Sequence, residues 1–357
     1  MKRFITLLII LINITPYVNG QNRIQGVERL RDMQEKGIMF GHQDAPFYGV
    51  GWRMQPERCD VKELCGDYPA VMGFDIGGIE VGDKKNVDSI PFTRMREEIL
   101  SHVERGGIVT LSWHPRNPLT GGTAWDVSDE TTVSSVLPGG TQHYKFLVWM
   151  RRVRDFLQSL RGEYDRPVSI IFRPWHENNG GWFWWGEPHC SDEEFHALWC
   201  MLQDYFLVEG LENLIWCYSP NYSSRLTEEH FLERYPGDER VDIIGLDAYQ
   251  WTLEEEEQYK TQLSSNLDVV CNYAEVHDKI VALTECGMQD VANAKWWTEV
   301  ITPLIEDYKI SYFLVWRNAG RHAYYGPSKE NADASDFLRM YEREDILFLE
   351  DILRKTE

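Results

Sequence analysis

The stretch VSIIFRPWHENNGGWFWWG, residues 168–186, decides how the rest of the sequence is interpreted. Its apolar start, Val168–Phe172, is typical of a strand that is buried on both faces. Pro174 cannot donate a hydrogen bond to a neighbouring strand, so we expect the strand to end at Arg173-Pro174. A loop with one carboxylic acid, one imidazole and five aromatic rings then follows: Glu177, His176, Trp175, Trp182, Phe183, Trp184 and Trp185.

This loop combines an acid with a large aromatic surface. A carboxyl group among indole rings is poorly solvated, which raises its pKa and suits Glu177 to donate a proton near neutral pH. Indole faces also stack on sugar rings, because both surfaces are flat and have an apolar side. We interpret the segment as a sugar-binding site that contains an acid. The alternative is a tryptophan-rich edge of the core beside a solvated glutamate.

Apolar runs of this kind recur along the chain and are separated by helical patterns. Eight such strands alternating with helices predict an α/β fold, the (β/α)8 TIM barrel, because a parallel sheet covered on both faces needs near-continuous apolar strands. The runs are Ile38–Gly41, Ala70–Phe74, Ile108–Trp113, Val168–Phe172, Leu214–Tyr218, Asp242–Leu246, Ile280–Thr284 and Tyr312–Trp316. Acids in the first turn after Ser191 indicate a helix over Asp192–Val208. We expect further helices over Trp296–Asp307 and Ser335–Lys355.

The length of 357 residues and the hydrophobic content of 43% suit one (β/α)8 catalytic domain, which we place at residues 21–357. Residues 1–20 have the features of a secretory signal peptide: the cations Lys2 and Arg3, the apolar run Phe4–Ile14 and the small-residue end Val18-Asn19-Gly20. The apolar run is shorter than the roughly 20 residues that a membrane-spanning helix needs. The sequence therefore predicts a secreted or periplasmic protein.

The net charge of −21 argues against nucleic acid and anionic membranes as partners, because phosphate binding needs Lys and Arg. A neutral polymer meets no such repulsion. Of the seven cysteines, Cys59 and Cys65 are close enough in sequence to pair in an oxidising compartment, whereas Cys217 and Cys286 lie in strand-like runs. We expect a monomer without a metal or cofactor.

A polar residue follows or ends nearly every apolar run. These residues are His42, Asp75, His114, Glu177, Asp247, Tyr249, Glu285 and Arg317. In a (β/α)8 barrel the active site lies at the carboxyl ends of the strands, so we expect this set to gather there. A single member of the set is more often a satisfied hydrogen-bonding group, and the argument depends on the whole set.

Glu177 and Glu285 follow the fourth and seventh runs and should face each other across the barrel mouth. Two carboxyl groups on either side of a glycosidic bond are sufficient for its hydrolysis. A separation of about 5–5.5 Å allows direct attack and retains the anomeric configuration, whereas a wider gap admits water and inverts it. An ionised Glu285 needs hydrogen-bond donors, and Arg317 and Tyr249 are the candidates.

The segments SWHPRNP, FRPWHENNGGWFWWG, GLDAY, LTECG and VWRN, in this order, resemble glycoside hydrolase family 26. The best-known members are β-mannanases of the retaining (β/α)8 clan. The resemblance implies a retaining glycosidase that cleaves β-1,4-mannosidic bonds in mannan, galactomannan or manno-oligosaccharides. Some members act from the chain end and release mannobiose. In those members a loop in the region of Gly77–Pro91 closes the glycone end, and here this loop reads as polar and flexible.

The resemblance also assigns roles residue by residue. Glu177 matches the acid/base and Glu285 the nucleophile, and Tyr249 matches the tyrosine that holds the nucleophile, with Asp247 beside it. Sugar-binding residues are implied at His114, His176 and Trp182 for the −1 subsite and at Arg317 for the −2 sugar. Trp113, Trp125 and Trp316 are either walls of the cleft or core residues.

Three other functions stay open. The same machinery could act on β-1,3-xylan or mixed-linkage β-glucan, as in some relatives. A sugar-binding barrel without catalysis would keep the aromatic residues but would not need two opposing acids. A metal-dependent hydrolase could use His42, His114 and Asp75, although the sequence has no His-x-His pair of the kind that is usual in such barrels.

Overall fold

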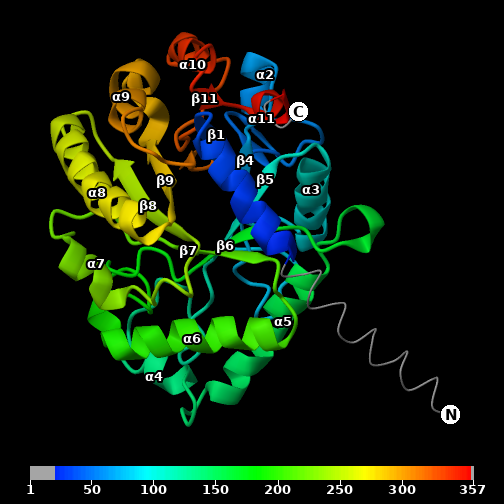
Figure 1. Cartoon of the computed structure of the whole chain (residues 1–357). Helices are drawn as coiled ribbons and strands as arrows, with labels where there is room; N and C mark the ends of the chain where they lie inside the picture. The colour runs from blue at the N-terminus through cyan, green and yellow to red at the C-terminus, as the bar shows by residue number, and fades with distance from the viewer. Residues whose placement is uncertain (1–20, 355–357) are drawn as a thin grey trace.

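The computed structural model describes residues 21–354. The segment interpreted as a signal peptide, residues 1–20, lies outside this range. Within it, no helix is both long enough and apolar enough to cross a membrane. Strands gather at the centre of the molecule and helices surround them, as Figure 1 shows.

Eight parallel strands form a closed barrel, which confirms the predicted fold. The strands are β1 (Ile38–Gln43), β4 (Val71–Asp75), β5 (Ile108–Trp113), β6 (Ile170–Pro174), β7 (Leu214–Tyr218), β8 (Ile243–Gln250), β9 (Ile280–Met288) and β10 (Tyr312–Val315). They pair in sequence order, and β10 pairs with β1 to close the circle. Strand β6 ends at Pro174, as the missing N–H of proline predicts.

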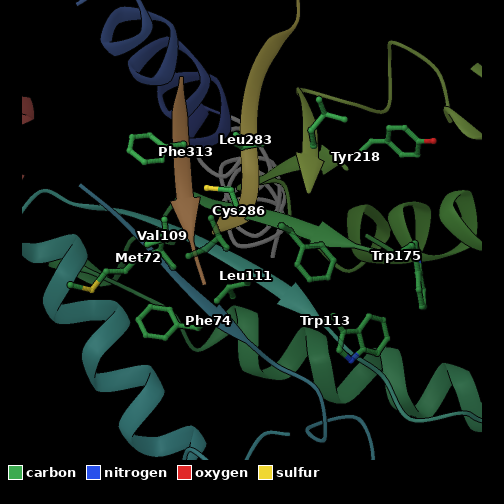
Figure 2. Close-up of a cluster of buried hydrophobic side chains, with 14 of the residues drawn as sticks. Met72, Phe74, Val109, Leu111, Trp113, Trp175, Tyr218, Leu283, Cys286 and Phe313 are labelled. Atoms are coloured by element: carbon green, nitrogen blue, oxygen red, sulfur yellow. The ribbon is translucent and has the colours of Figure 1, made fainter. Parts of the chain in front are cut away.

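Side chains alternate between the inside and the outside of the barrel. Met39, Val71 and Ile171 belong to a cluster inside the barrel. Their neighbours Phe40 and Met72 belong to a larger cluster between the strands and the helices. Figure 2 shows part of this outer cluster, with side chains from β4, β5, β9 and β10. Both faces of each strand are therefore buried, which is why the sequence shows apolar runs without polar alternation.

Helices alternate with the barrel strands, as predicted. They are α2 (Asp60–Cys65), α3 (Phe92–Glu104), α4 (Thr132–Val136), α5 (His143–Gln158), α6 (Asp192–Val208), α7 (Glu228–Arg234), α8 (Glu256–His277), α9 (Thr302–Ile305), α10 (Ala334–Tyr341) and α11 (Leu349–Arg354). Helix α6 has the predicted bounds, because Ser191 and Glu194 form a capping box. The helix expected over Trp296–Asp307 is present at residues 296–305, but it is not α-helical throughout. A π-helical turn, Trp297–Ile301, leads directly into α9, where Pro303 has no N–H to donate.

The amino-terminal end of the barrel is closed by two segments. The helix of residues 21–34 places Leu30 and Met33 in the inner cluster, and in Figure 1 it crosses the barrel in blue. The short strand β11 (Ile346–Leu347) pairs with β1 between α10 and α11. The single helix expected over Ser335–Lys355 is therefore wrong. Residues 346–348 are consecutive apolar residues, all buried, and a strand buries such a run better than one face of a helix.

Strand β9 contains a bulge that aims Glu285 at the barrel mouth. Leu246 of β8 pairs with Leu283, but the next residue, Asp247, pairs with Glu285, so Thr284 is an extra residue in β9. Regular alternation would have turned Glu285 outward, as it turns Leu283. The bulge instead places Glu285 on the same side as Asp247.

The disulfide that the sequence allowed between Cys59 and Cys65 is not present. All seven cysteines lie in the described part of the chain, and none of them forms a disulfide there. Cys65 instead contacts the carbonyl oxygen of Val61 one turn earlier in α2. Cys217 and Cys286 are buried, as expected of small apolar residues in strands.

We expect Phe40→Ala to lower the free energy of unfolding by about 3–5 kcal/mol, because the change leaves a cavity in the outer cluster. Phe40 is fully buried, and its ring centroid lies 5.0 Å from that of Phe348 and 5.4 Å from that of Phe313. Urea unfolding followed by circular dichroism measures the loss. Tyr144→Ala is the control, because this side chain is 83% exposed and its loss should change stability by less than about 0.5 kcal/mol. Equal stability of the two variants would contradict the prediction.

Candidate active site

Three acids from three strands meet at the carboxyl end of the barrel. Glu177 follows β6, Asp247 lies in β8 and Glu285 lies in β9. One carboxylate oxygen of each lies within 4.8 Å of one oxygen of each of the other two. Asp247 and Glu285 are buried, and Glu177 is partly buried. The structure thus brings together the two glutamates that the sequence placed on opposite sides of the barrel mouth.

Arg173 holds two of these acids and was missed by the sequence analysis. Its guanidinium Nη1 donates to Asp247 Oδ2 at 2.7 Å and to Ser219 Oγ at 3.1 Å, and its Nη2 donates to Glu285 Oε1. The two carboxylates raise the pKa of Arg173 despite its burial, so it stays a cation. Alternation along β6 could have found it, because Ile171 points into the barrel and Arg173 is two residues further on.

Tyr249 is the second donor to Glu285, as predicted. Its hydroxyl donates to Glu285 Oε2 at 2.8 Å. Burial and the nearby charges of Glu285 and Glu177 raise the pKa of Tyr249 well above its usual value, so the phenol keeps its proton. Thr284, the bulge residue, donates to Asp247 Oδ1 at 2.6 Å. Both oxygens of Glu285 are therefore held by donors.

Arg317 does not hold Glu285, and that part of the prediction is wrong. Its guanidinium pairs with Asp88 Oδ1 at 2.7 Å, beyond the end of β10, and lies over the ring of Tyr48 at 5.1 Å. The pair joins the loop after β10 to the loop after β4. The latter loop, expected to be polar and flexible over Gly77–Pro91, is also held by the buried Asn86, whose side chain bonds to the backbone of Asp75 and Ile90.

Glu177 has the environment of a proton donor. Burial raises its pKa well above the usual value, and the charges of Asp247 and Glu285 add to this effect. Trp182 Nε1 donates to Glu177 Oε2 at 2.6 Å, and the backbone N–H of Glu177 donates to Ser219 O at 2.7 Å. Glu177 has a positive φ of 52°, which is uncommon for a residue with a side chain and is found at functional sites.

A chain of hydrogen bonds fixes the two site histidines. Asp75 Oδ2 lies 2.7 Å from His114 Nδ1, and His114 Nε2 lies 3.1 Å from His176 Nε2. Burial opposes the charge on His114, but the Asp75 carboxylate outweighs it and raises the pKa of His114. Burial, with help from His114 and Arg173, lowers the pKa of His176 well below its usual value. The raised pKa of His114 and the lowered pKa of His176 favour His114 Nε2 as the hydrogen-bond donor and His176 Nε2 as the acceptor.

Most aromatic residues of the 173–186 segment are core residues, which corrects the sugar-stacking prediction. Trp175, Trp184 and Trp185 are fully buried. Trp184 and Trp185 donate to the backbone oxygens of Pro115 and His176 and so anchor the loop. The alternative of a tryptophan-rich core edge was therefore right about these rings. Its solvated glutamate was wrong, because Glu177 is partly buried beside two other acids.

The remaining aromatic candidates divide between core and cleft. Trp113 is fully buried against Trp175, Trp316 is partly buried, and Trp125 is half-exposed and stacks on His114 with ring centroids 5.1 Å apart. Trp251, which the sequence analysis missed, stacks on Tyr249. Its position two residues after Tyr249, next to the end of a strand, was the available signal.

The donors proposed for a metal site are not arranged as one. Among residues 21–354, the group of three or more possible ligands that come together is Glu177, Asp247 and Glu285. His42 is not part of it and has both ring nitrogens buried without a hydrogen-bond partner. Arg173 already donates to two of the three carboxylates, so the set is arranged around a cation of the protein itself.

Comparisons with known proteins agree on one family. The model of glycosyl hydrolase family 26 matches residues 19–324. A mannan endo-1,4-beta-mannosidase of Bifidobacterium adolescentis is 31% identical over 82% of this chain, and one of Bacillus subtilis is 28% identical over 72%. The matched regions are 31% and 68% of those proteins, so this chain spans about a third of the length of the first. The structure of a β-mannanase of this family from Bacteroides ovatus has a TM-score of 0.89 and 44% identity over 92% of this chain and 95% of that one.

We expect Glu285→Gln to lower the pKa of Glu177, because the change removes a negative charge that disfavours ionisation of Glu177. Carboxyl ¹³C NMR of protein labelled at the glutamate side chains measures this titration, and Glu177→Gln identifies the signal. Glu257→Gln, at a side chain that is 90% exposed, is the matched control and should leave the pKa of Glu177 unchanged. A pKa of Glu177 that stays the same or rises in Glu285→Gln would contradict this account of the site.

Proposed function

Because the chain belongs to glycosyl hydrolase family 26, we propose that it is a β-mannanase that hydrolyses β-1,4-mannosidic bonds with retention of configuration. One observation carries the proposal: Glu177 and Glu285 have oxygens within 4.8 Å of each other, and only Glu285 is held by a guanidinium. This spacing suits direct attack, because an inverting pair needs about 6.5–9.5 Å to admit water. The relatives named for mannan hydrolysis supply the substrate class.

The two glutamates divide the chemistry in two steps. Glu177 gives its proton to the glycosidic oxygen, and the bond from that oxygen to the anomeric carbon breaks as Glu285 Oε attacks the same carbon. The glycone is then held as an ester on Glu285, and the leaving sugar departs as an alcohol. Glu177, now ionised, takes a proton from water, whose oxygen attacks the anomeric carbon and releases Glu285 as a carboxylate.

The surrounding residues support each acid in its role. Arg173 and Tyr249 donate to Glu285, which keeps a carboxylate lone pair aimed at the cleft while the charge is compensated. Trp182 holds Glu177, and its donation becomes stronger when Glu177 ionises in the first step. His114, His176 and Arg317 are proposed to line the sugar-binding subsites on the glycone side of the bond.

Two further features of the protein belong to this proposal. Residues 1–20 direct the chain to the periplasm or the outside of the cell, where its polymeric substrate is found, and fractionation of cells that express the full chain tests this. The ion pair of Arg317 with Asp88 joins the loops after β4 and β10, and we propose that the joined loops bound the glycone end of the substrate site. Such a boundary favours products of defined length from the non-reducing end.

We expect Glu285→Ala and Glu177→Gln to lower kcat on mannan at least about 10³-fold, because each removes a group that acts only in the transition state. Hydrolysis of mannan and circular dichroism of each variant separate lost chemistry from lost folding. Glu257→Gln is the matched control and should keep full activity, since its side chain is exposed.

Azide distinguishes the two roles. In Glu177→Ala, azide attacks the ester without needing a base and should give β-mannosyl azide. In Glu285→Ala, azide replaces the nucleophile and should give the α-azide. Full turnover in either variant, or the opposite anomers, would overturn the assignment.

We expect wild-type protein to cleave mannan faster than β-1,3-xylan or lichenan, and assays of the three polymers side by side measure this. The product series from mannohexaose over time then defines the mode of attack. Mannobiose alone from the earliest time indicates release from the chain end, and mixed oligosaccharides indicate internal cleavage. No product from any of the three polymers would support a binding protein without catalysis.

A further inference from the structure

Exposed tryptophans are concentrated at the catalytic centre. Three of the 14 tryptophans, Trp125, Trp182 and Trp251, have more than a third of their surface exposed. Each of the three contacts a different residue of the site: Trp125 stacks on His114, Trp182 bonds to Glu177 and Trp251 stacks on Tyr249. Exposing an indole forgoes the free energy of its burial, so three exposed indoles around one site indicate a ligand that covers them.

Trp251 is the most exposed of the three and has no other function in the proposed mechanism. Its side chain is 54% exposed, directly after β8. Its ring lies 5.3 Å from that of Tyr249 with an angle of 26° between the planes, so one face is covered by Tyr249. The backbone N–H groups of Trp251 and Thr252 donate to Glu255 Oε2 at 3.1 and 3.3 Å. The indole is thus presented from a fixed backbone, with Tyr249 between it and Glu285.

The order of strands shows which part of the substrate Trp251 meets. Around the barrel, β7 and β8 lie between β6, which carries Glu177, and β9, which carries Glu285. The other way round leads through β10, β1, β4 and β5, and the loops after β4 and β10 are joined by the Arg317–Asp88 pair. The proposed function assigns the glycone to this half, because Arg317 is proposed to bind the −2 sugar. A sugar chain whose scissile bond lies between the two glutamates extends over both halves of the barrel mouth. Its glycone part lies over one half and its leaving-group part over the other. Trp251 lies in the half opposite the glycone and therefore in the half of the leaving group.

We propose that Trp251 is a platform for the leaving-group part of the substrate, on which a β-1,4-linked mannosyl residue stacks the apolar face of its ring. This proposal rests on the proposed function and deepens it, because it assigns a specificity-determining residue on the side of the bond that departs. The stack aligns the leaving sugar, so that its oxygen meets the proton of Glu177. It also binds the sugar that acts as acceptor when a second oligosaccharide, rather than water, attacks the ester.

Two substrates separate this role from a structural one. β-Mannobiosyl fluoride occupies only the glycone side, because its leaving group is a fluoride ion, whereas mannohexaose also fills the leaving-group side. We expect Trp251→Ala to lower kcat/KM on mannohexaose roughly tenfold, the equivalent of a stack of about 1.4 kcal/mol, and to leave kcat/KM on the fluoride unchanged. Trp251→Phe should recover part of the loss, and Trp251→Ala should form less transglycosylation product from mannotetraose.

Leu253→Ala is the matched control, because Leu253 lies two residues further along the same loop and is 49% exposed. It should change neither rate. Equal losses on both substrates in Trp251→Ala would show that the indole only supports Tyr249, and no loss on either would show that it contacts no sugar; each result overturns the proposal. If wild-type protein cleaves neither substrate, the proposed function itself fails, which is a distinct outcome.

Discussion

The active site depends on the ion pairs that the buried guanidinium of Arg173 makes with two carboxylates. Two carboxylates inside a barrel repel each other and lose their hydration, so both can stay ionised side by side only if a cation compensates their charge. Arg173 supplies that cation and donates from β6 to Asp247 in β8 and to Glu285 in β9, so these three strands are tied together by charge. Its planar fork also sets the angle of Glu285, which a lysine at this position would not do.

The barrel and its set of polar strand ends were predictable because both arise from regular patterns. Apolar runs such as Ile108–Trp113 and Leu214–Tyr218 agree residue for residue with β5 and β7. Pairing and closure follow from eight strands of one kind, and the location of polar residues at one end follows from the fold. The tail was not predictable in the same way. Residues 346–348 are too short a run to be told from part of a helix, and they form a strand because β1 offers a free edge at Ile38.

Details of the site depend on single-residue features, such as one extra residue in a strand, and sequence patterns do not show these. The extra residue Thr284 turns Glu285 inward, although alternation from Leu283 would have turned it out. Arg317 was assigned to the wrong partner, because the ion pair with Asp88 joins loops that are 229 residues apart in the chain (317 − 88). Arg173 and Trp251 were missed because each stands next to a more conspicuous motif. The role of Arg173 comes from contacts across strands, which are long-range in sequence.

The apolar plug at the amino-terminal end of the barrel lies at the opposite end from the catalytic mouth. Leu30, Met33 and Leu347 close that end, and they belong to the inner apolar cluster and not to the site of the three acids. The two ends can therefore be altered independently: repacking the plug changes resistance to heat, and exchanging loops at the mouth changes what the site can bind. The packing of the plug can therefore be improved first, because the added stability should be kept whatever loops are later placed at the other end of the barrel.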